Sequence, residues 1–253
     1  MLKVVFHPRY HEVYASDPAA APGRLEPAAA LLAARFPFVE PYPAAEEDVL
    51  LVHTARHLTW VKQRPHTYEL ALLAAGGAIT ASQLAAQGEK AFGLIRPPGH
   101  HASPDSSWGF CWFNNVAIAV EKLRRGGAIA RAIIIDIDLH YGDGTANIFA
   151  RVPEVVYHHV KGMGRQDFLR DLEDFLSRQG DADLVAVSAG FDRHEHDWGR
   201  MLKTEDYRSV GKMVGAFAAA HCRGRVFAVL EGGYNSDTLG ESALALLEGL
   251  EEE

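Results

Sequence analysis

Residues 132–144, with the sequence Ala-Ile-Ile-Ile-Asp-Ile-Asp-Leu-His-Tyr-Gly-Asp-Gly, decide how this chain folds. The stretch begins with apolar, mostly β-branched residues, which predict a strand buried on both faces of a parallel sheet. Alternate residues of an extended segment share a face, so we expect Asp136, Asp138 and His140 to point the same way. Carboxylates so close repel each other unless a metal ion or a proton neutralises one, which favours a bound cation. One alternative stays open at this point: the acids could simply cap the following glycine-containing turn.

The composition is that of an ordinary soluble globular chain. Its 253 residues are 48% hydrophobic and 23% charged, which suits one large α/β domain, and we take 1–253 as a single domain. The formal net charge of -8 argues against electrostatic binding to nucleic acid or anionic lipid. Two cysteines cannot form a disulfide framework, and the first residues lack the apolar length of a secretory signal. We therefore expect the protein to be located in the reducing cytoplasm. The sequence has no uninterrupted apolar run of about 18 residues, which a membrane-spanning helix would need.

Three further apolar runs also end in polar residues that can carry chemistry. His100 and His101 follow the run at 91–95, Asp192 follows the run at 184–188, and Tyr234 follows the run at 226–230. Helical patterns separate these runs, and they cover residues 25–36, 68–86, 116–125, 167–179, 204–221 and 236–250. Strands that alternate with helices predict a parallel sheet, whose ligands sit beyond the carboxyl ends of the strands. We therefore expect all four polar strand ends to converge.

Shorter patterns complete the expected order of elements. Residues 2–6 and 155–157 predict two more strands, and Thr54 is expected to cap a short helix. Gly76 and Gly77 lie inside the helix predicted at 68–86, where each glycine costs about 1 kcal/mol relative to alanine. We expect that cost to be offset by close backbone packing at the pair.

In these motifs the chain resembles the zinc-dependent histone deacetylases and their bacterial relatives, the acetylpolyamine amidohydrolases and acetoin-utilisation proteins. The matching stretches, in family order, are residues 96–102, 109–115, 136–144, 188–192 and 231–234, with weaker similarity at 24–26, 52–53 and 76–77. The resemblance implies the arginase/deacetylase fold, a single α/β domain with a central, mainly parallel sheet flanked by helices. It also implies that the zinc ligands are Asp138, His140 and Asp192.

The same resemblance pairs His100 with Asp136 and His101 with Asp143, and turns Tyr234 toward a substrate carbonyl. These roles agree with what the chemistry needs. Three protein ligands leave a position for water, whose pKa zinc lowers to about 7, although iron(II) or cobalt(II) would also suit two carboxylates and an imidazole. We expect His101 to be the general base and acid, and Tyr234 to donate a hydrogen bond to the developing oxyanion.

The substrate slot is expected to be lined by residues of several loops, namely Gly109, Phe110, Trp112, Met163 and Gly232. Met163 belongs to residues 158–164, which replace a much longer stretch of the family that carries a potassium site and part of the rim. A structural potassium ion next to Asp136 therefore stays an open question. We expect His158 and His159 to lie behind the site or on the surface, and residues 194–196 to form a polar rim.

Together these features predict a metal-dependent amidohydrolase that removes an acetyl or other acyl group from an amine, such as acetyl-lysine or an acetylated polyamine. Two alternatives remain. One is a non-catalytic module of deacetylase shape that binds acylated amines. The other is an arginase-like hydrolase with two manganese ions, which would need further bridging carboxylates. The physiological substrate, the native metal and the oligomeric state stay open at this point.

Overall fold

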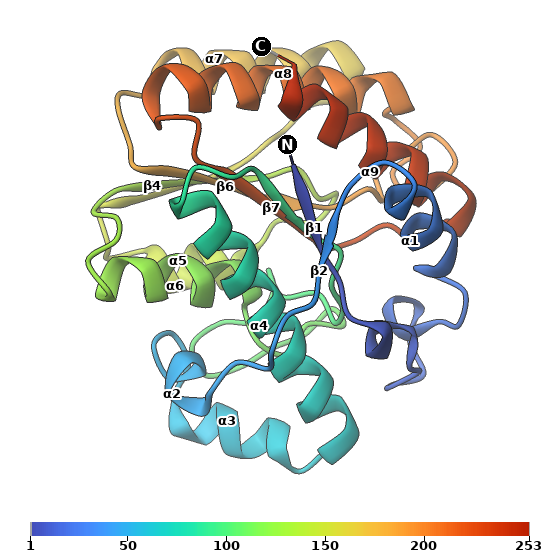
Figure 1. Cartoon of the computed structure of the whole chain (residues 1–253), viewed down its shortest axis with the longest axis vertical. Helices are drawn as coiled ribbons and strands as arrows, with labels where there is room; N and C mark the ends of the chain where they lie inside the picture. The colour runs from blue at the N-terminus through green and yellow to red at the C-terminus, as the bar shows by residue number, and fades with distance from the viewer. Residues whose placement is uncertain (1, 253) are drawn as a thin grey trace.

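A computed structural model describes residues 2–252, which fold around one seven-stranded sheet (Figure 1). The strand order is β2-β1-β3-β7-β6-β4-β5, and every neighbouring pair is parallel. The strands are β1 (Lys3–Val5), β2 (Phe38–Val39), β3 (Ala91–Gly93), β4 (Ala132–Asp136), β5 (Val155–His159), β6 (Leu184–Ala189) and β7 (Val226–Leu230). The predicted α/β class with a central parallel sheet is confirmed.

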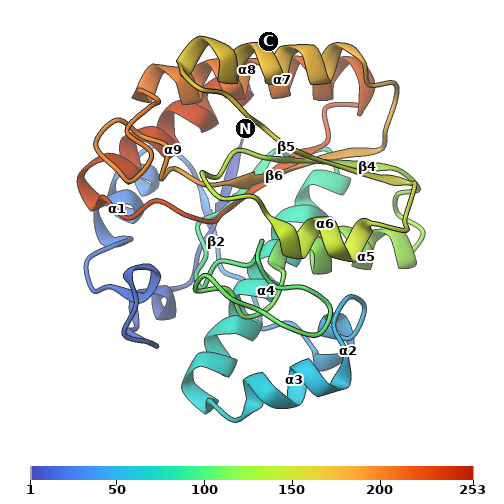
Figure 2. The same cartoon turned by 180° about the vertical axis from the view of Figure 1, so that it is seen from behind.

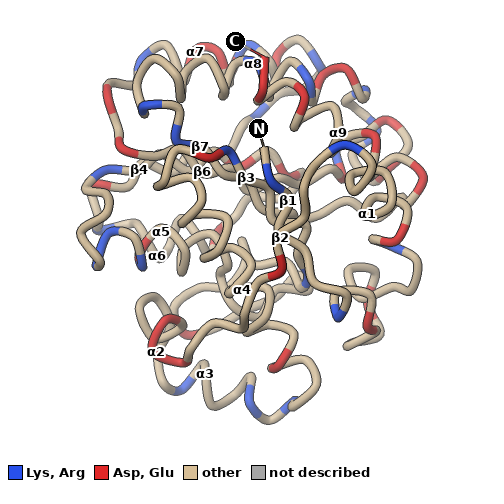
Figure 3. The backbone as a smooth tube through the Cα atoms, viewed as in Figure 1, with Lys and Arg blue, Asp and Glu red and all other residues tan. Residues whose placement is uncertain are grey.

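Helices cover both faces of the sheet, as the front and back views show (Figures 1 and 2). One layer contains α1 (Glu26–Ala33), α7 (Arg165–Ser177), α8 (Thr204–His221) and α9 (Ser236–Glu251). The other contains α4 (Pro65–Ala86), α5 (Asn115–Arg125) and α6 (Asp143–Phe149), with α2 (Glu46–Val49) and α3 (Ala55–Lys62) beyond them. Two short 3-10 helices, Pro8–His11 and Pro18–Ala20, lie between β1 and α1. Basic and acidic residues are interspersed along the outer helices (Figure 3).

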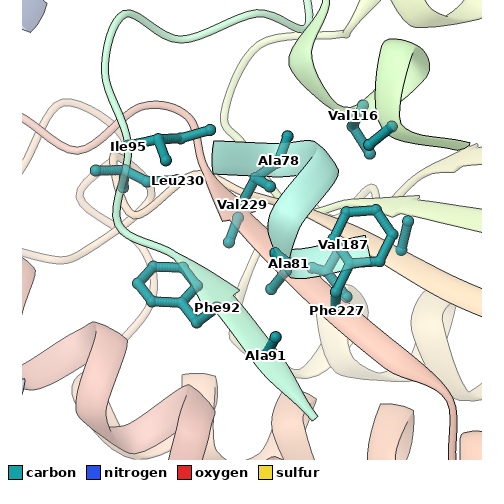
Figure 4. Close-up of a cluster of buried hydrophobic side chains, with 14 of the residues drawn as sticks. Ala78, Ala81, Ala91, Phe92, Ile95, Val116, Val187, Phe227, Val229 and Leu230 are labelled. Carbon is teal, nitrogen blue, oxygen red and sulfur yellow. The ribbon is translucent and has the colours of Figure 1, made fainter. Parts of the chain in front are cut away.

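The core lies between α4 and the middle of the sheet. Small side chains on α4, Ala78 and Ala81, let the helix approach the larger Phe227 and Val229 of β7, whereas Phe92 of β3, in register with Ala228, lies on the other face of the sheet (Figure 4). In length and hydropathy α4 could cross a membrane, but 67% of its apolar window is buried inside the fold, as expected of a core helix.

The glycine pair in α4 packs as closely as the sequence predicted. A side-chain carbon at Gly76 would collide with the carbonyl oxygen of Tyr42, and one at Gly77 would lie 2.7 Å from the Tyr10 hydroxyl. Only glycine fits both positions, so the cost of glycine inside a helix is offset by this contact.

The sheet brings the four polar strand ends to one edge. Asp136, the last residue of β4, is in register with Ser188 of β6 and His159 of β5. Strands β3, β7, β6 and β4 are consecutive neighbours, and the functional stretches follow each of them directly. The sequence did not predict α6, which begins at Asp143, nor the two-residue strand β2, because both are too short to show a periodic pattern.

Candidate active site

Three side chains that follow β4 and β6 form a compact group of potential metal ligands. The ligand atoms of Asp138, His140 and Asp192 all lie within 4.8 Å of one another. His140 Nδ1 is 3.1 Å from Asp138 Oδ1 and 3.0 Å from Asp192 Oδ2. Both carboxylates are fully buried, and among the described residues the buried Asp192 Oδ2 has no well-aligned hydrogen-bond donor. A buried carboxylate oxygen with only His140 Nδ1 near it suits a metal ligand.

The charges of this group call for a cation. Burial and the nearby charge of Asp138 raise the pKa of Asp192, and Asp138 and Asp192 together raise the pKa of His140 to about 10. A proton on His140 therefore offsets part of the negative charge of the two carboxylates in the metal-free protein. A divalent ion that displaces this proton would supply the same compensation.

The acids also hold the backbone of the turn, as the alternative interpretation of the sequence required. Asp136 Oδ1 accepts from the Asp138 amide at 3.1 Å, Asp138 Oδ1 from the His140 amide at 2.9 Å, and Asp192 Oδ1 from the Leu139 amide at 2.9 Å. Capping and cation binding are therefore compatible, because capping rigidifies the turn that carries two of the three ligands.

Two histidine–carboxylate pairs lie beside the trio. His100 Nδ1 is 3.0 Å from Asp136 Oδ2, and His101 Nδ1 is 2.7 Å from Asp143 Oδ1. Both imidazoles come from the loop after β3, and their ring centroids are 4.1 Å apart. The structure thus brings together both pairs that the resemblance implied, although their partners are far apart in the chain.

The two pairs differ in their electrostatics. Burial and the charge of His100 lower the pKa of His101 to about 4, although Asp143 opposes this shift. At His100 burial disfavours the charged form, but Asp138 and Asp136 outweigh it and raise the pKa. His101 is therefore neutral at pH 7 while His100 is positively charged, and such a separation of pKa values distinguishes a base from an electrostatic partner.

Tyr234 follows β7 and lies over the same group. Gly232 donates its amide to Asp138 Oδ2 at 2.8 Å, and a side-chain carbon at Gly232 would come within 2.5 Å of that oxygen. Burial, together with the charge of Asp138, raises the pKa of Tyr234, so the phenol keeps its proton. The backbone amide of Tyr234 donates to Asp197 Oδ2 at 2.7 Å, which fixes the start of the loop that carries the ring.

Aromatic side chains stand around the trio. Trp108 lies against the His101 ring at a tilt of 31°, with centroids 3.9 Å apart, and donates its indole N–H to Asp143 Oδ2 at 2.9 Å. Trp198 stacks on Tyr234 at 4.0 Å, and Phe110 meets the two rings edge-on, at 5.9 Å from Tyr234 and 6.4 Å from Trp198.

The turn that presents Phe110 is tight. Gly109 has φ 60 and Phe110 has φ 69, a left-handed conformation that is rare for an aromatic residue. Gly109 also lies against His101, because a side-chain carbon there would be 2.6 Å from its ring. Outliers of this kind cluster at functional sites.

Two residues expected in the slot lie elsewhere. Trp112 stacks on Trp60 of α3 at 5.6 Å, and its carbonyl oxygen lies 2.8 Å from His57 Nε2 of the same helix, so this residue packs on α3. Met163 is 98% exposed and lines a surface groove with Lys161 and Arg170, because residues 160–164 connect β5 directly to α7 without folding back over the trio. Trp198, not Met163, stands against Tyr234.

The other flagged histidines lie outside the trio. His158 is bound to Asp171 at 2.8 Å, and His194 Nε2 is 3.2 Å from Thr204 Oγ1. His159 Nε2 lies 2.9 Å from the carbonyl oxygen of Asp138, behind the metal ligands. His158 and His159 therefore lie behind the site or near the surface, as expected, whereas His194 is buried against α8 and does not form part of a polar rim.

Sequence reasoning missed several residues that the fold adds to the site. Trp108 and Trp198 are loop residues whose only sequence signal is their closeness to Gly109 and Asp192. Glu231 directly follows β7 and is buried, and its Oε2 accepts the amides of Gly99 at 2.6 Å and His100 at 3.1 Å. Its position at a strand end could have flagged it.

A second buried group of potential ligand atoms consists of His100, Cys111 and Glu231. It shares no residue with the trio of Asp138, His140 and Asp192. Among the described residues no carboxylate therefore bridges the two groups, as a binuclear site would need.

The fold and this site define an α/β protein of the arginase/deacetylase class. A model of the histone deacetylase domain matches residues 19–168 and 158–250. The chain is 32% identical over 268 residues to a probable deacetylase of Methanothermobacter thermautotrophicus, covering 85% of this chain and 80% of that protein. It is also 32% identical over 272 residues to a histone deacetylase-like amidohydrolase of Pseudomonas aeruginosa, covering 87% and 72%.

A solved structure supports the same assignment. The crystal structure of the HDA15 HD domain matches with a TM-score of 0.83 and 25% identity, over 98% of this chain and 89% of that chain. The chain therefore belongs to the histone deacetylase family, whose members are generally metal-dependent and act on acetylated amines.

Proposed function

We propose that this chain is a metal-dependent amidohydrolase that removes an acetyl or another acyl group from an amine such as acetyl-lysine or an acetylated polyamine. The observation that carries the proposal is the convergence of the trio with a neutral histidine and a protonated tyrosine. Each of these groups has an ordinary structural explanation on its own. Their meeting at one sheet edge, with charges suited to amide hydrolysis, favours catalysis.

Asp138, His140 and Asp192 would hold the ion. A bound zinc ion would activate a water molecule by lowering its pKa to about 7 and would polarise the substrate carbonyl. Two carboxylates make this ligand set harder than that of most zinc sites, so iron(II) and cobalt(II) are further candidates. The grouping of the three ligand atoms within 4.8 Å of one another supports this assignment.

His101 is the proposed general base and acid. Asp143 holds Nδ1, which leaves Nε2 free to take a proton from water and to deliver it to the departing amine. Trp108 holds Asp143 in turn, so the ring orientation of His101 is set by two contacts. His100 is bound to Asp136, and in its charged form it would stabilise negative charge that develops next to it.

Tyr234 is the proposed oxyanion donor. Its raised pKa keeps the hydroxyl protonated, so it can donate to the carbonyl oxygen as negative charge develops there. Asp197 accepts the amides of both Tyr234 and Asn235, which positions this loop before substrate arrives. The preorganised donor needs no rearrangement in the transition state.

Phe110, Trp198 and Trp108 form apolar walls suited to an unbranched alkyl chain that ends in the amide. The His140 side chain is 36% exposed, so the trio lies near the surface and not at the bottom of a deep channel. A shallow site gives little room for contacts with a surrounding peptide. We therefore expect small acylated amines to be accepted alongside acetyl-lysine.

A turnover panel tests this function. Acetyl-lysine peptides, acetylated polyamines and longer acyl-lysines are offered to protein reconstituted with zinc, iron(II) or cobalt(II), and the released amine is measured. We expect cleavage by the wild type and none by His101→Ala, whose metal content should be unchanged. A protein that binds these amides without ever cleaving them would favour the binding module. A requirement for two manganese ions per chain would favour the arginase-like alternative.

A further inference from the structure

A buried arginine holds the carbonyl oxygens behind the candidate metal ligands. Arg193 is only 5% exposed, and its Nε donates to the carbonyl oxygen of Asp138 at 3.0 Å. Its Nη2 donates to the carbonyl oxygen of Val160 at 3.1 Å and reaches that of Leu139 at 3.4 Å. The guanidinium carbon lies 5.1 Å from the centre of the Phe168 ring. One side chain thus ties together the ends of β4 and β5.

Arg193 also connects two of the three candidate ligands. It is adjacent in the chain to Asp192, and it holds the backbone of Asp138 through the bond just described. Its own carbonyl oxygen accepts the amides of Met201 at 3.0 Å and Leu202 at 2.8 Å, which closes the loop that carries Trp198. The position of this one residue therefore affects the spacing of the ligands and one wall of the slot.

The surroundings of the guanidinium are unusual for a buried charge. Within residues 2–252 it forms no ion pair with a carboxylate. Its acceptors are backbone carbonyl oxygens, and its Nη2 also lies 3.2 Å from His159 Nε2. Burying a charge is costly unless nearby groups compensate it. Burial lowers the pKa of Arg193, and the charges of Asp192, Asp138 and Asp136 oppose this shift through space. A cradle of carbonyl oxygens around one positive charge is also how proteins hold a monovalent cation.

The oxygen atoms next to Asp136 do not fit an added potassium ion. Asp136 Oδ1 accepts from the Asp138 amide, and its carbonyl oxygen accepts from the Val160 amide at 2.9 Å. Asp136 Oδ2 lies 3.0 Å from His100 Nδ1 and accepts a hydrogen bond from the Tyr157 hydroxyl at 2.9 Å. Because Arg193 also donates to the carbonyl oxygen of Asp138, the oxygens that a potassium ion would need already have hydrogen-bond donors.

We propose that Arg193 is a built-in cation that positions the metal-ligand loop and replaces a bound monovalent ion. Binding of the divalent metal is then independent of potassium. The inference rests on the proposed metal site at Asp138, His140 and Asp192, but it does not need turnover to be tested.

The test measures the affinity of metal-free protein for cobalt(II) in potassium, sodium and choline chloride at equal ionic strength. Wild type should bind equally tightly in all three salts. Arg193→Met, which fills the space without the charge, should bind cobalt roughly 10- to 100-fold more weakly, as for other residues that support metal ligands. Arg170→Ala is the matched control, because Arg170 lines the same groove but is largely exposed, and its affinity should equal that of wild type.

Rescue separates a positioning role from a general loss of stability. In Arg193→Ala the vacated cradle should admit a small cation, so low millimolar guanidinium or potassium should restore part of the cobalt affinity and of its visible spectrum. Choline is too large to do so, and Arg193→Met should not respond. Arg193→Lys, which keeps the charge but reaches fewer carbonyl oxygens, should fall between wild type and Arg193→Met. It also keeps the test usable if the alanine variant does not fold.

Two results would overturn the proposal. Wild-type protein that loses metal affinity when choline replaces potassium must have a separate monovalent site. Arg193→Met with wild-type affinity would show that the charge does not matter. If only the proposed amidohydrolase function were wrong, the result would differ from both of these. The metal would still bind equally tightly in all three salts, but no amide would be cleaved.

Discussion

Replacing Tyr234 with phenylalanine tests the proposed chemistry most directly. Within the described residues the phenol oxygen has no hydrogen-bond partner, so the variant loses no bond of the folded state. The contacts of the ring remain, namely Trp198 at 4.0 Å, Phe110 at 5.9 Å and the Arg24 guanidinium at 5.2 Å. We therefore expect the free energy of unfolding to stay within about 0.5 kcal/mol of wild type.

Turnover should change far more than stability. Loss of one donor to a developing oxyanion lowers kcat by roughly 100- to 1,000-fold, which corresponds to about 3 to 4 kcal/mol of barrier. Affinity for the substrate should change little, because the hydrogen bond forms mainly in the transition state. The expected signature is a collapsed kcat with KM, metal content and melting temperature near those of wild type.

The assay follows release of the free amine from an acetylated amine, with metal analysis and thermal denaturation on the same samples. Tyr141→Phe is a matched control, because Tyr141 is exposed and contacts Tyr157 and His159 only through its ring. That variant should cleave at the wild-type rate. Wild-type turnover by Tyr234→Phe would refute the role of the phenol.

Three further predictions concern the metal, the slot and acid stability. Asp192→Ala should lose the divalent metal, which metal analysis of purified protein would show; a full equivalent retained would remove Asp192 from the ligand set. Trp198→Ala removes a proposed apolar wall of the slot, so KM for an alkyl amide should rise roughly threefold to tenfold, which corresponds to about 1 kcal/mol of lost burial. Met163→Ala should match wild type. His53 has its pKa lowered to about 3 by burial, and its Nε2 accepts the amide of Asn114 at 2.9 Å. The unfolded chain therefore takes up a proton below about pH 6.5 that the folded protein refuses until near pH 3, and stability is lost across this window by about 1.4 kcal/mol per pH unit. In His53→Gln, denaturant unfolding between pH 6.5 and 4.5 should show a slope shallower by that amount, and an unchanged slope would contradict the pKa.

Much of the fold could be predicted from the sequence because its signals are local. The apolar runs at 132–135, 184–188 and 226–230 are long enough to identify buried strands. Their parallel arrangement follows from the helices between them. The convergence of Asp138, Asp192 and Tyr234 is then a consequence of topology, since the strands that precede them are neighbours in one parallel sheet.

The pairings within the site are less local. His100 lies 36 residues from Asp136 and His101 lies 42 residues from Asp143, so spacing alone could not match them. The resemblance to a known family provided these pairs, and the structure brings them together. Helix α6 was missed although it begins at Asp143, because its seven residues open with a glycine-containing turn.

The amino-acid sequence by itself determined the strands, their polar ends and the types of ligand available, because each depends on neighbouring residues. Only the tertiary structure decided which aromatic residues form the walls. Trp112 and Trp198 look alike in the sequence, but contacts with Trp60 and His57 hold Trp112 against α3, while Trp198 stacks on Tyr234, whose amide Asp197 accepts. The cradle of Arg193 is likewise tertiary, because the directions of its carbonyl oxygens depend on how the ends of β4 and β5 pack against the loop after β6.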